Sequence, residues 1–243
     1  MTPACSLLLL LLTALPQGVE VIETPELLAT LAPPARVHLA ELDPPSTVDA
    51  FLRKRPEALV AINGGFFDKT WTGTLIPTGL VMTEGRVRWP SAAEVGAGKD
   101  SRRSAYQKKA AREARWYGVF LITRDKVARV LPSTKLPSSG LLAKAQLALE
   151  SGPVLVREGR VVTRQASSQA LRTAVGVTRD GRVLLLCTRK PMTLVQLAQA
   201  LVKLGAVEAL NLDGGPSSSF ASRERASQVE GQEVYTALYI TNT

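Results

Sequence analysis

Two glycine turns carry the polar residues best suited to chemistry. Asn63 stands directly before Gly64-Gly65, and the segment NLDGGPSSS places Asn211 and Asp213 just before Gly214-Gly215. Glycine lets the chain turn and lets a ligand approach the backbone, and successive N–H groups in such turns can bind an anion. The residues expected to contact a substrate here are Asn63, Gly64, Gly65, Asn211, Gly214, Gly215 and Ser217. Asn-Gly-Gly and Asp-Gly-Gly are also ordinary turn sequences. Each motif alone is therefore also compatible with a turn that has no chemical role.

Two further segments supply a carboxylate and a cation. Glu150 precedes Ser151-Gly152-Pro153, and Arg172 opens the segment RTAVG. Arginine presents a planar, permanently charged fork that matches the oxygens of carboxylates and phosphates. A structural ion pair stays open for Arg172. The carboxylates of Asp213 and, with less support, Glu150 are the candidates for acid, base or nucleophile.

Several common hydrolase chemistries lack their residues in this chain. His38 is the only histidine, and the HExxH, CxxC and Walker patterns are absent. One histidine and one mature-chain cysteine do not assemble a zinc site. We expect no cofactor. A divalent ion between Asp68 and Asp213 stays open, without specific support from their spacing. What remains is chemistry by carboxylates, arginine and backbone amides.

The elements that must position these residues are mainly short strands joined by tight turns. Hairpins are expected around Glu84-Gly85, Arg124-Asp125, Glu158-Gly159 and Asp180-Gly181. Short strands at 58–63 and 206–213 lead into the two glycine turns, and 236–242 is a last strand. Thr47 to Arg53 reads as a short helix. Thr193 to Leu204 is an amphipathic helix that Gly205 ends. We therefore expect an α+β fold with a mixed, mostly antiparallel β-sheet core and packed helices.

The N-terminus has the pattern of a secretory signal. Leu7 to Leu12 form an apolar run too short to span a bilayer, so residues 1–18 are expected to be a signal peptide and 19–243 a single exported domain. No transmembrane span is expected in the mature chain. Removal of this leader leaves only Cys187, in an apolar run that favours a buried structural thiol.

The chain is basic, with a formal net charge of +9. This charge favours anionic partners but does not choose among nucleic acid, a membrane surface, an anionic envelope polymer and a phosphorylated substrate such as a sugar phosphate. Basic residues are densest from Lys99 to Arg115. A solvated surface helix is the favoured interpretation of this segment, and a contact with a polyanion is the functional alternative. Zinc-finger spacing and RNP-like strands are absent, so no specific nucleic-acid module is expected. The sequence does not indicate an oligomeric state.

Taken together and in order, INGGFFD, ESGPVLV, RTAVGV and NLDGGPSSS resemble the phosphodiester glycosidase family over roughly residues 36–241. The resemblance implies hydrolysis of the glycosidic C–O bond of a sugar-1-phosphodiester. It implies Asp213 as nucleophile or general base, Arg172 as phosphate ligand, and the asparagines and glycines as substrate contacts. Pro216 replaces an expected third glycine. Because proline lacks an N–H, any oxyanion contact made by that amide would be lost.

Other functions stay open from the sequence. A non-catalytic domain on the same fold could bind carbohydrate or envelope polymer, and Pro216 favours that alternative. A phosphodiesterase would cut the P–O bond instead. A structural or inhibitory secreted protein would use the glycine turns only as turns.

Overall fold

The computed structural model describes residues 15–97, 116–223 and 225–242. The expected signal segment lies mostly before residue 15, so it stays a prediction, as does the domain boundary at residue 19. The basic segment 99–115 lies outside the described residues. Within them, no helix is both long and apolar enough to cross a membrane.

The largest sheet has seven strands in the order β1-β2-β15-β14-β16-β12-β13. Its strands are β1 (Glu20–Glu23), β2 (Leu27–Ala32), β15 (Val183–Thr188), β14 (Thr173–Thr178), β16 (Ala206–Asn211), β12 (Val154–Arg157) and β13 (Arg160–Val161). The hairpins expected around Glu158-Gly159 and Asp180-Gly181 are both confirmed as neighbouring antiparallel strands of this sheet.

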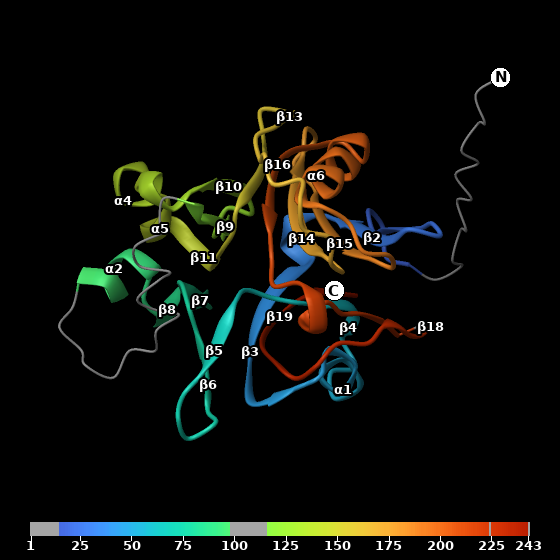
Figure 1. Cartoon of the computed structure of the whole chain (residues 1–243), viewed down its shortest axis with the longest axis horizontal. Coiled ribbons are helices and arrows are strands. Elements are labelled where there is room, and N and C mark those ends of the chain that lie inside the picture. Colours follow the sequence, from blue (N-terminus) through green and yellow to red (C-terminus); the bar gives the residue numbers. More distant parts are fainter. Residues whose placement is uncertain (1–14, 98–115, 224, 243) are drawn as a thin grey trace.

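Two smaller sheets of five strands complete the core. The β9 sheet runs in the order β10 (Ala128–Pro132), β9 (Gly118–Thr123), β11 (Ala145–Ser151), β7 (Val81–Thr83) and β8 (Arg86–Trp89). The β4 sheet runs in the order β18 (Arg225–Val229), β17 (Phe220–Ser222), β4 (Ala58–Asn63), β19 (Val234–Thr241) and β3 (Val37–Ser46). A separate hairpin pairs β5 (Phe67–Lys69) with β6 (Leu75–Pro77), and it extends away from the body of the molecule (Figure 1).

The helices of the described residues are few and short. They are η1 (Pro34–Arg36), α1 (Val48–Arg53), α2 (Ala92–Ala97), η3 (Ser133–Lys135), α4 (Leu136–Ser139), α5 (Leu141–Lys144), α6 (Leu194–Lys203) and η4 (Gly215–Ser217). Two of the helices expected from the sequence, at 47–53 and 193–204, are confirmed as α1 and α6. Thr47 caps α1 by accepting from Ala50 N, and Thr193 forms a capping box with Gln196 on α6.

The expected α+β class needs correction, because the fold is β-rich with few helices. The sheets are mostly antiparallel, as expected, and the strand pairs described are all antiparallel rather than mixed. Unrecognised strands account for much of the difference. Residues 27–32 and 145–149 are mainly apolar and have no clear two-residue alternation, and periodicity alone does not distinguish such a run from a buried helix.

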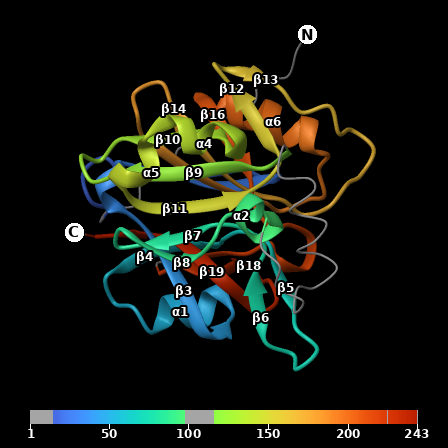
Figure 2. The ribbon, with the colours of Figure 1, turned by 90° about the vertical axis from the view of Figure 1, so that its left-hand side faces the viewer.

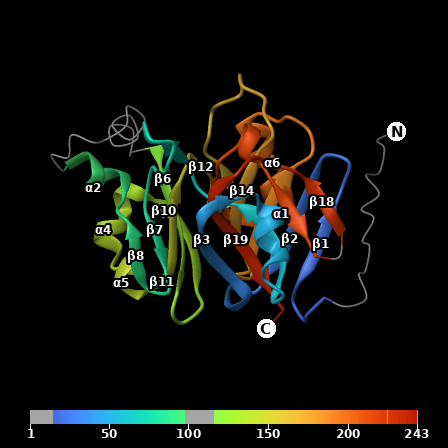
Figure 3. The same ribbon diagram turned by 90° about the horizontal axis from the view of Figure 1, so that it is seen from below.

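The three sheets surround one common core, and helices cover their outer faces (Figures 2 and 3). Alternate residues of each strand point to opposite sides. On β15, Val183 and Leu185 enter the common core, whereas Leu184 and Leu186 pack against the buried face of α6. The β4 sheet is covered by α1, and the β9 sheet by α4 and α5. This double burial explains why the central strands read as continuous apolar runs.

Candidate active site

Asn63, the last residue of β4, connects the separate sequence blocks. Its side chain is fully buried. The amide nitrogen donates to the main-chain oxygens of Asp213, at 2.8 Å, and of Gly64, at 3.4 Å. The amide oxygen accepts from Thr173 Oγ1 at 2.7 Å and from Ser219 N at 3.0 Å. These four bonds use the hydrogen-bonding capacity of the amide. Asn63 therefore positions the site instead of offering its side chain to a substrate.

Asp213 follows β16 and is the carboxylate at the centre of this cluster. Its main-chain N–H donates to Gly64 O at 3.1 Å, which places it beside the first glycine turn. Its carboxylate accepts from Gly214 N at 2.9 Å and from the Ser217 hydroxyl. Burial raises the pKa of Asp213 to about 6, although both hydrogen bonds act to lower it. The group is mostly ionised at pH 7 and is poised to exchange a proton near neutrality.

Arg172 directly precedes β14 and lies next to Gly214 in the same turn. Its Nε donates to Met192 O at 3.0 Å and its Nη2 to Ser168 O at 2.9 Å, so main-chain oxygens fix the guanidinium. A Cβ added to Gly214 would lie 3.8 Å from Nη1, which puts that nitrogen next to the residue after Asp213. Burial lowers the pKa of Arg172, but arginine remains protonated in proteins.

Arg172 is a partly buried cation without an acidic partner among the described residues. The structural ion pair that the sequence left open is therefore not formed with those residues. A charge held in this way is oriented by neutral carbonyls and keeps its attraction for an anion. The geometry suits an anionic ligand placed beside Gly214 and Asp213.

The glycine amides do not form the expected anion nest. Gly64 N donates to Thr236 O at 2.8 Å and Gly65 N to Thr236 Oγ1 at 3.2 Å. Gly214 N bonds the Asp213 carboxylate, and Gly215 N donates to the main-chain oxygen of Leu171 at 2.8 Å. Each amide is thus already used within the protein. The cationic group that lies beside these amides is the guanidinium of Arg172.

These glycines are required by close packing and by one turn. A Cβ on Gly64 would lie 2.2 Å from Thr236 Oγ1, and one on Gly214 would lie 3.1 Å from Leu171 O. Gly215 has a φ of +61°, in the left-handed region that favours glycine. Pro216 follows in the first turn of η4, where a helix does not need the missing N–H. Proline therefore fits this turn without loss of a structural hydrogen bond.

Asn211 and Glu150 are buried behind the turns. Asn211 Nδ2 donates to Gly152 O and Leu212 O, both at 2.8 Å, whereas its Oδ1 has no partner. Glu150 is 2% exposed, and its Oε2 accepts from Leu80 N at 2.9 Å and Ala92 N at 2.7 Å. Glu150 is thus held by the segments before β7 and at the start of α2. It makes no hydrogen bond to Asp213 or Arg172.

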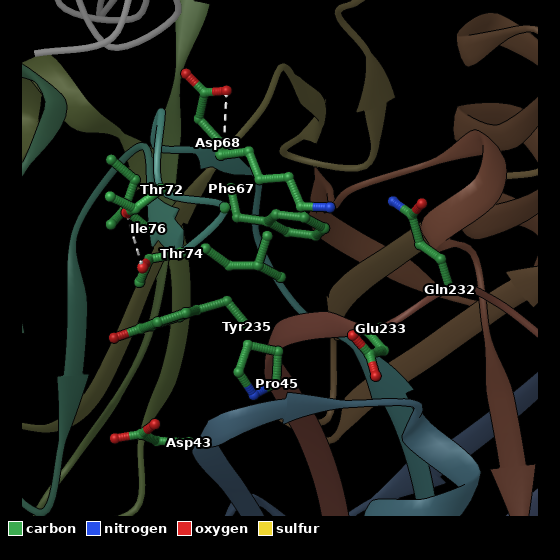
Figure 4. Close-up of a pocket in the computed structure, with 13 residues that line it drawn as sticks. Asp43, Pro45, Phe67, Asp68, Thr72, Thr74, Ile76, Gln232, Glu233 and Tyr235 are labelled. Atoms are coloured by element: carbon green, nitrogen blue, oxygen red, sulfur yellow. Dashed lines mark hydrogen bonds between the residues drawn. The ribbon is translucent and has the colours of Figure 1, made fainter.

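A cavity of about 1020 Å³ is lined in part by Gln232, whose main-chain N–H donates to Pro216 O at 2.8 Å, whereas Asp213 and Arg172 do not line it. The sequence motifs predicted little of this cavity. It lies between the β5–β6 hairpin, the end of β3 and the segment before β19 (Figure 4). Gln232 on its wall donates from Nε2 to Ser217 Oγ at 3.0 Å, and Ser217 in turn bonds Asp213. The walls come from three distant segments without a shared motif. The one available signal was Asp68, close after the Gly64-Gly65 turn.

Other sequence expectations concern metals and the cysteine. The described residues contain no group of three or more His, Cys, Asp and Glu side chains placed to hold a metal ion. Cys187 is buried on β15, as expected, and burial raises the pKa of its thiol to about 12. Such a thiol is a poor nucleophile at neutral pH.

The order of the blocks and their convergence on Asp213 can now be compared with known proteins. The model of the phosphodiester glycosidase family matches residues 56–241. The chain belongs to this family. The match includes each block that meets at Asn63 and Asp213, together with the hairpin that borders the cavity. A search of curated protein sequences found no match.

Solved structures share the fold of this phosphodiester glycosidase domain at low sequence identity. One is the catalytic domain of zebrafish N-acetylglucosamine-1-phosphodiester α-N-acetylglucosaminidase, auto-inhibited by its pro-peptide. It has a TM-score of 0.63 and 18% identity over 93% of this chain and 82% of that one. A protein of Burkholderia pseudomallei named as exported has a TM-score of 0.60 and 14% identity, over 92% and 76% of the two chains. A hypothetical protein from Synechocystis has a TM-score of 0.58 and 18% identity, over 93% and 61%.

Proposed function

We propose that the chain is an exported glycosidase that hydrolyses the glycosidic C–O bond of a sugar-1-phosphodiester, with the phosphate as leaving group. The observation that carries this proposal is the placement of Asp213 and Arg172 next to the same residue, Gly214. One residue is a carboxylate with a raised pKa, and the other is an arginine without an acidic partner among the described residues.

The leaving group explains why one carboxylate is sufficient. Most glycosidases use a second carboxylic acid to protonate a poor alkoxide leaving group. A phosphodiester-linked sugar departs instead as a phosphate monoester, which is a weak base and needs charge stabilisation more than a proton. Arg172 provides that stabilisation, and a well-placed donor of this kind is worth about 3–4 kcal/mol in the transition state.

Asp213 acts at the anomeric carbon. As a nucleophile it forms a bond to this carbon while the C–O bond to phosphate breaks, and water then hydrolyses the glycosyl ester. As a general base it takes a proton from the water that attacks the same carbon. Both routes need the ionised carboxylate, and both leave the phosphate with its bridging oxygen. The raised pKa keeps Asp213 basic enough to accept a proton near neutral pH.

The remaining predicted residues have supporting roles in this proposal. Asn63 positions the Asp213 main chain, and Ser217 and Gly214 orient its carboxylate. Glu150 is assigned a structural role, because it is almost fully buried and already accepts two main-chain N–H groups. Asn211 is likewise a positioning residue through Gly152 and Leu212.

Hydrolysis in oxygen-18 water tests which bond breaks. The methyl phosphodiester of N-acetylglucosamine 1-phosphate is a suitable first substrate, because the similar zebrafish enzyme is named for this linkage. We expect the released methyl phosphate to carry no label, since its oxygen comes from the substrate. Label in the phosphate would show P–O cleavage and overturn the proposal. Binding of this diester without turnover would instead support a non-catalytic carbohydrate-binding domain.

A further inference from the structure

The cavity beside the β5–β6 hairpin has walls in which acidic side chains outnumber basic ones among the described residues, although the protein is basic. Asp43, Asp68 and Glu233 contribute carboxylates, and Lys69 is the one basic side chain among the described residues of its wall. None of the three acids forms an ion pair with another described residue. Asp68 accepts a hydrogen bond from Lys69 N at 2.8 Å. These described side chains give the wall more negative than positive charge, which favours a neutral ligand over a phosphate, although the chain as a whole carries a net charge of +9.

Aromatic and hydroxyl groups complete the walls. Phe67 and Tyr235 provide ring faces, and Thr72 and Thr74 line the hairpin side (Figure 4). Tyr235 donates its hydroxyl to Glu41 at 3.3 Å, which holds the ring in place. Ring faces beside carboxylate acceptors suit a ligand with apolar C–H faces and several hydroxyl donors. A sugar ring has both features. A volume of about 1020 Å³ is ample for one ring with its bound water.

Hydrogen bonds connect the wall of this cavity to Asp213. Ser217 and Gln232 connect the carboxylate to the cavity. Gly214 N bonds the same carboxylate, and the Arg172 guanidinium lies next to Gly214. A substrate that spans Asp213 would then have its phosphate at Arg172 and its sugar ring at the cavity, with the anomeric carbon between them.

We infer that the cavity bordered by Phe67, Asp68, Tyr235 and Glu233 is the subsite for a neutral, hydroxyl-rich sugar ring, the ring whose bond to phosphate is cleaved. The identification of this ring as part of the substrate rests on the proposed function. Binding of a free sugar in the cavity does not.

The test measures binding without turnover. The probes are neutral methyl α-glycosides of glucose, galactose, mannose and N-acetylglucosamine, titrated by saturation-transfer NMR, with methyl α-glucosaminide as a cationic comparison. The variant Asp43→Ala/Glu233→Ala removes two exposed carboxylates of the cavity, so we expect it to fold. The control Glu26→Ala/Asp125→Ala makes the same change of charge at exposed positions elsewhere. Dimethyl phosphate serves as a separate probe of the Arg172 side.

We expect at least one neutral glycoside to bind the wild type and the control alike, and to bind the cavity variant about fivefold or more weakly, because each lost hydrogen bond reduces affinity by this order. Dimethyl phosphate should be unaffected by the cavity variant and weakened by Arg172→Ala. The inference fails if no neutral glycoside binds, if the cavity variant binds as well as the control, or if only the amino sugar binds and salt abolishes its binding. If the protein hydrolyses a phosphodiester but one of these failures occurs, the proposed function stands and the subsite inference is wrong. If a neutral glycoside binds in the cavity but no phosphodiester is hydrolysed, the sugar site stands and the proposed function is wrong.

Discussion

The side-chain amide of Asn63 donates a 2.8 Å hydrogen bond to the main-chain oxygen of Asp213, which follows 150 residues later in the chain. The same amide oxygen accepts from Thr173 and from Ser219 N. A single buried side chain thus holds together the strands and turns that carry the proposed catalytic residues.

Replacement of Asn63 should test this positioning role. We expect Asn63→Ala to lower the free energy of unfolding by about 3–5 kcal/mol, because it leaves several buried polar groups without partners. Chemical denaturation would measure the change. Asn242→Ala is the matched control, because Asn242 is exposed, and it should change stability by less than about 0.5 kcal/mol. Equal, small effects of both variants would show that the Asn63 bonds contribute little.

The raised pKa of Asp213 has a consequence for stability. The carboxylate has a pKa of about 6 in the folded chain, above its ordinary value of 3.8, so folding disfavours its ionised form. This cost is absent below pH 4, grows between pH 4 and 6, and is complete above pH 6. We expect Asp213→Asn to raise the free energy of unfolding by about 1–3 kcal/mol at pH 7 and by much less at pH 3.5. Glu26→Gln should show no such gain, and a destabilised Asp213→Asn at pH 7 would contradict the assignment.

The same pKa predicts the pH dependence of activity. Because both proposed routes need ionised Asp213, kcat/KM should rise with pH and level off above an apparent pKa of about 6. A phosphodiester substrate does not titrate in this range, so the limb reports the free enzyme. Initial rates from pH 4 to 9 would measure it. A rate that falls as pH rises through 6 would mean that the protonated carboxyl is the active form.

Arg172 should matter most for substrates that carry phosphate. We expect Arg172→Ala to lower kcat/KM on a sugar-1-phosphodiester by about 10²–10³-fold, and to have a much smaller effect on an aryl glycoside, whose leaving group is not a phosphate. Arg179→Ala is the control, because Arg179 is exposed on the turn after β14. Losses of equal size on the two substrates would be inconsistent with phosphate binding by Arg172.

Much of the fold could be predicted where turn chemistry and periodicity agree. Asp180-Gly181 and Glu158-Gly159 identified hairpins, and Thr193 with Gly205 identified both ends of α6. Strand β11 was missed, since its residues 145–149 are nearly all apolar and buried on both faces. The expected α+β class was wrong for the same reason, because missed strands made the fold look less β-rich than it is.

Part of the candidate site could also be predicted, because its blocks are local in sequence. Asn63, Arg172 and Asp213 each stand at the end or start of a strand next to a short motif. The hydrogen-bond partners of the glycine amides could not be predicted. Thr236 lies far from Gly64 and Gly65 in the sequence, and Leu171 belongs to no recognisable motif. The cavity depends on tertiary packing of distant segments, and no local pattern encodes it.

The most direct measurement of the central claim is the rate of Asp213→Asn on a sugar-1-phosphodiester. Folded variant protein, checked by circular dichroism, should have a kcat/KM at least about 10³-fold below that of the wild type, because the chemical step loses its nucleophile or base. Asp125→Asn changes an exposed carboxylate and should retain the wild-type rate. A folded Asp213→Asn protein that hydrolyses the diester within tenfold of the wild-type rate would contradict the proposed mechanism.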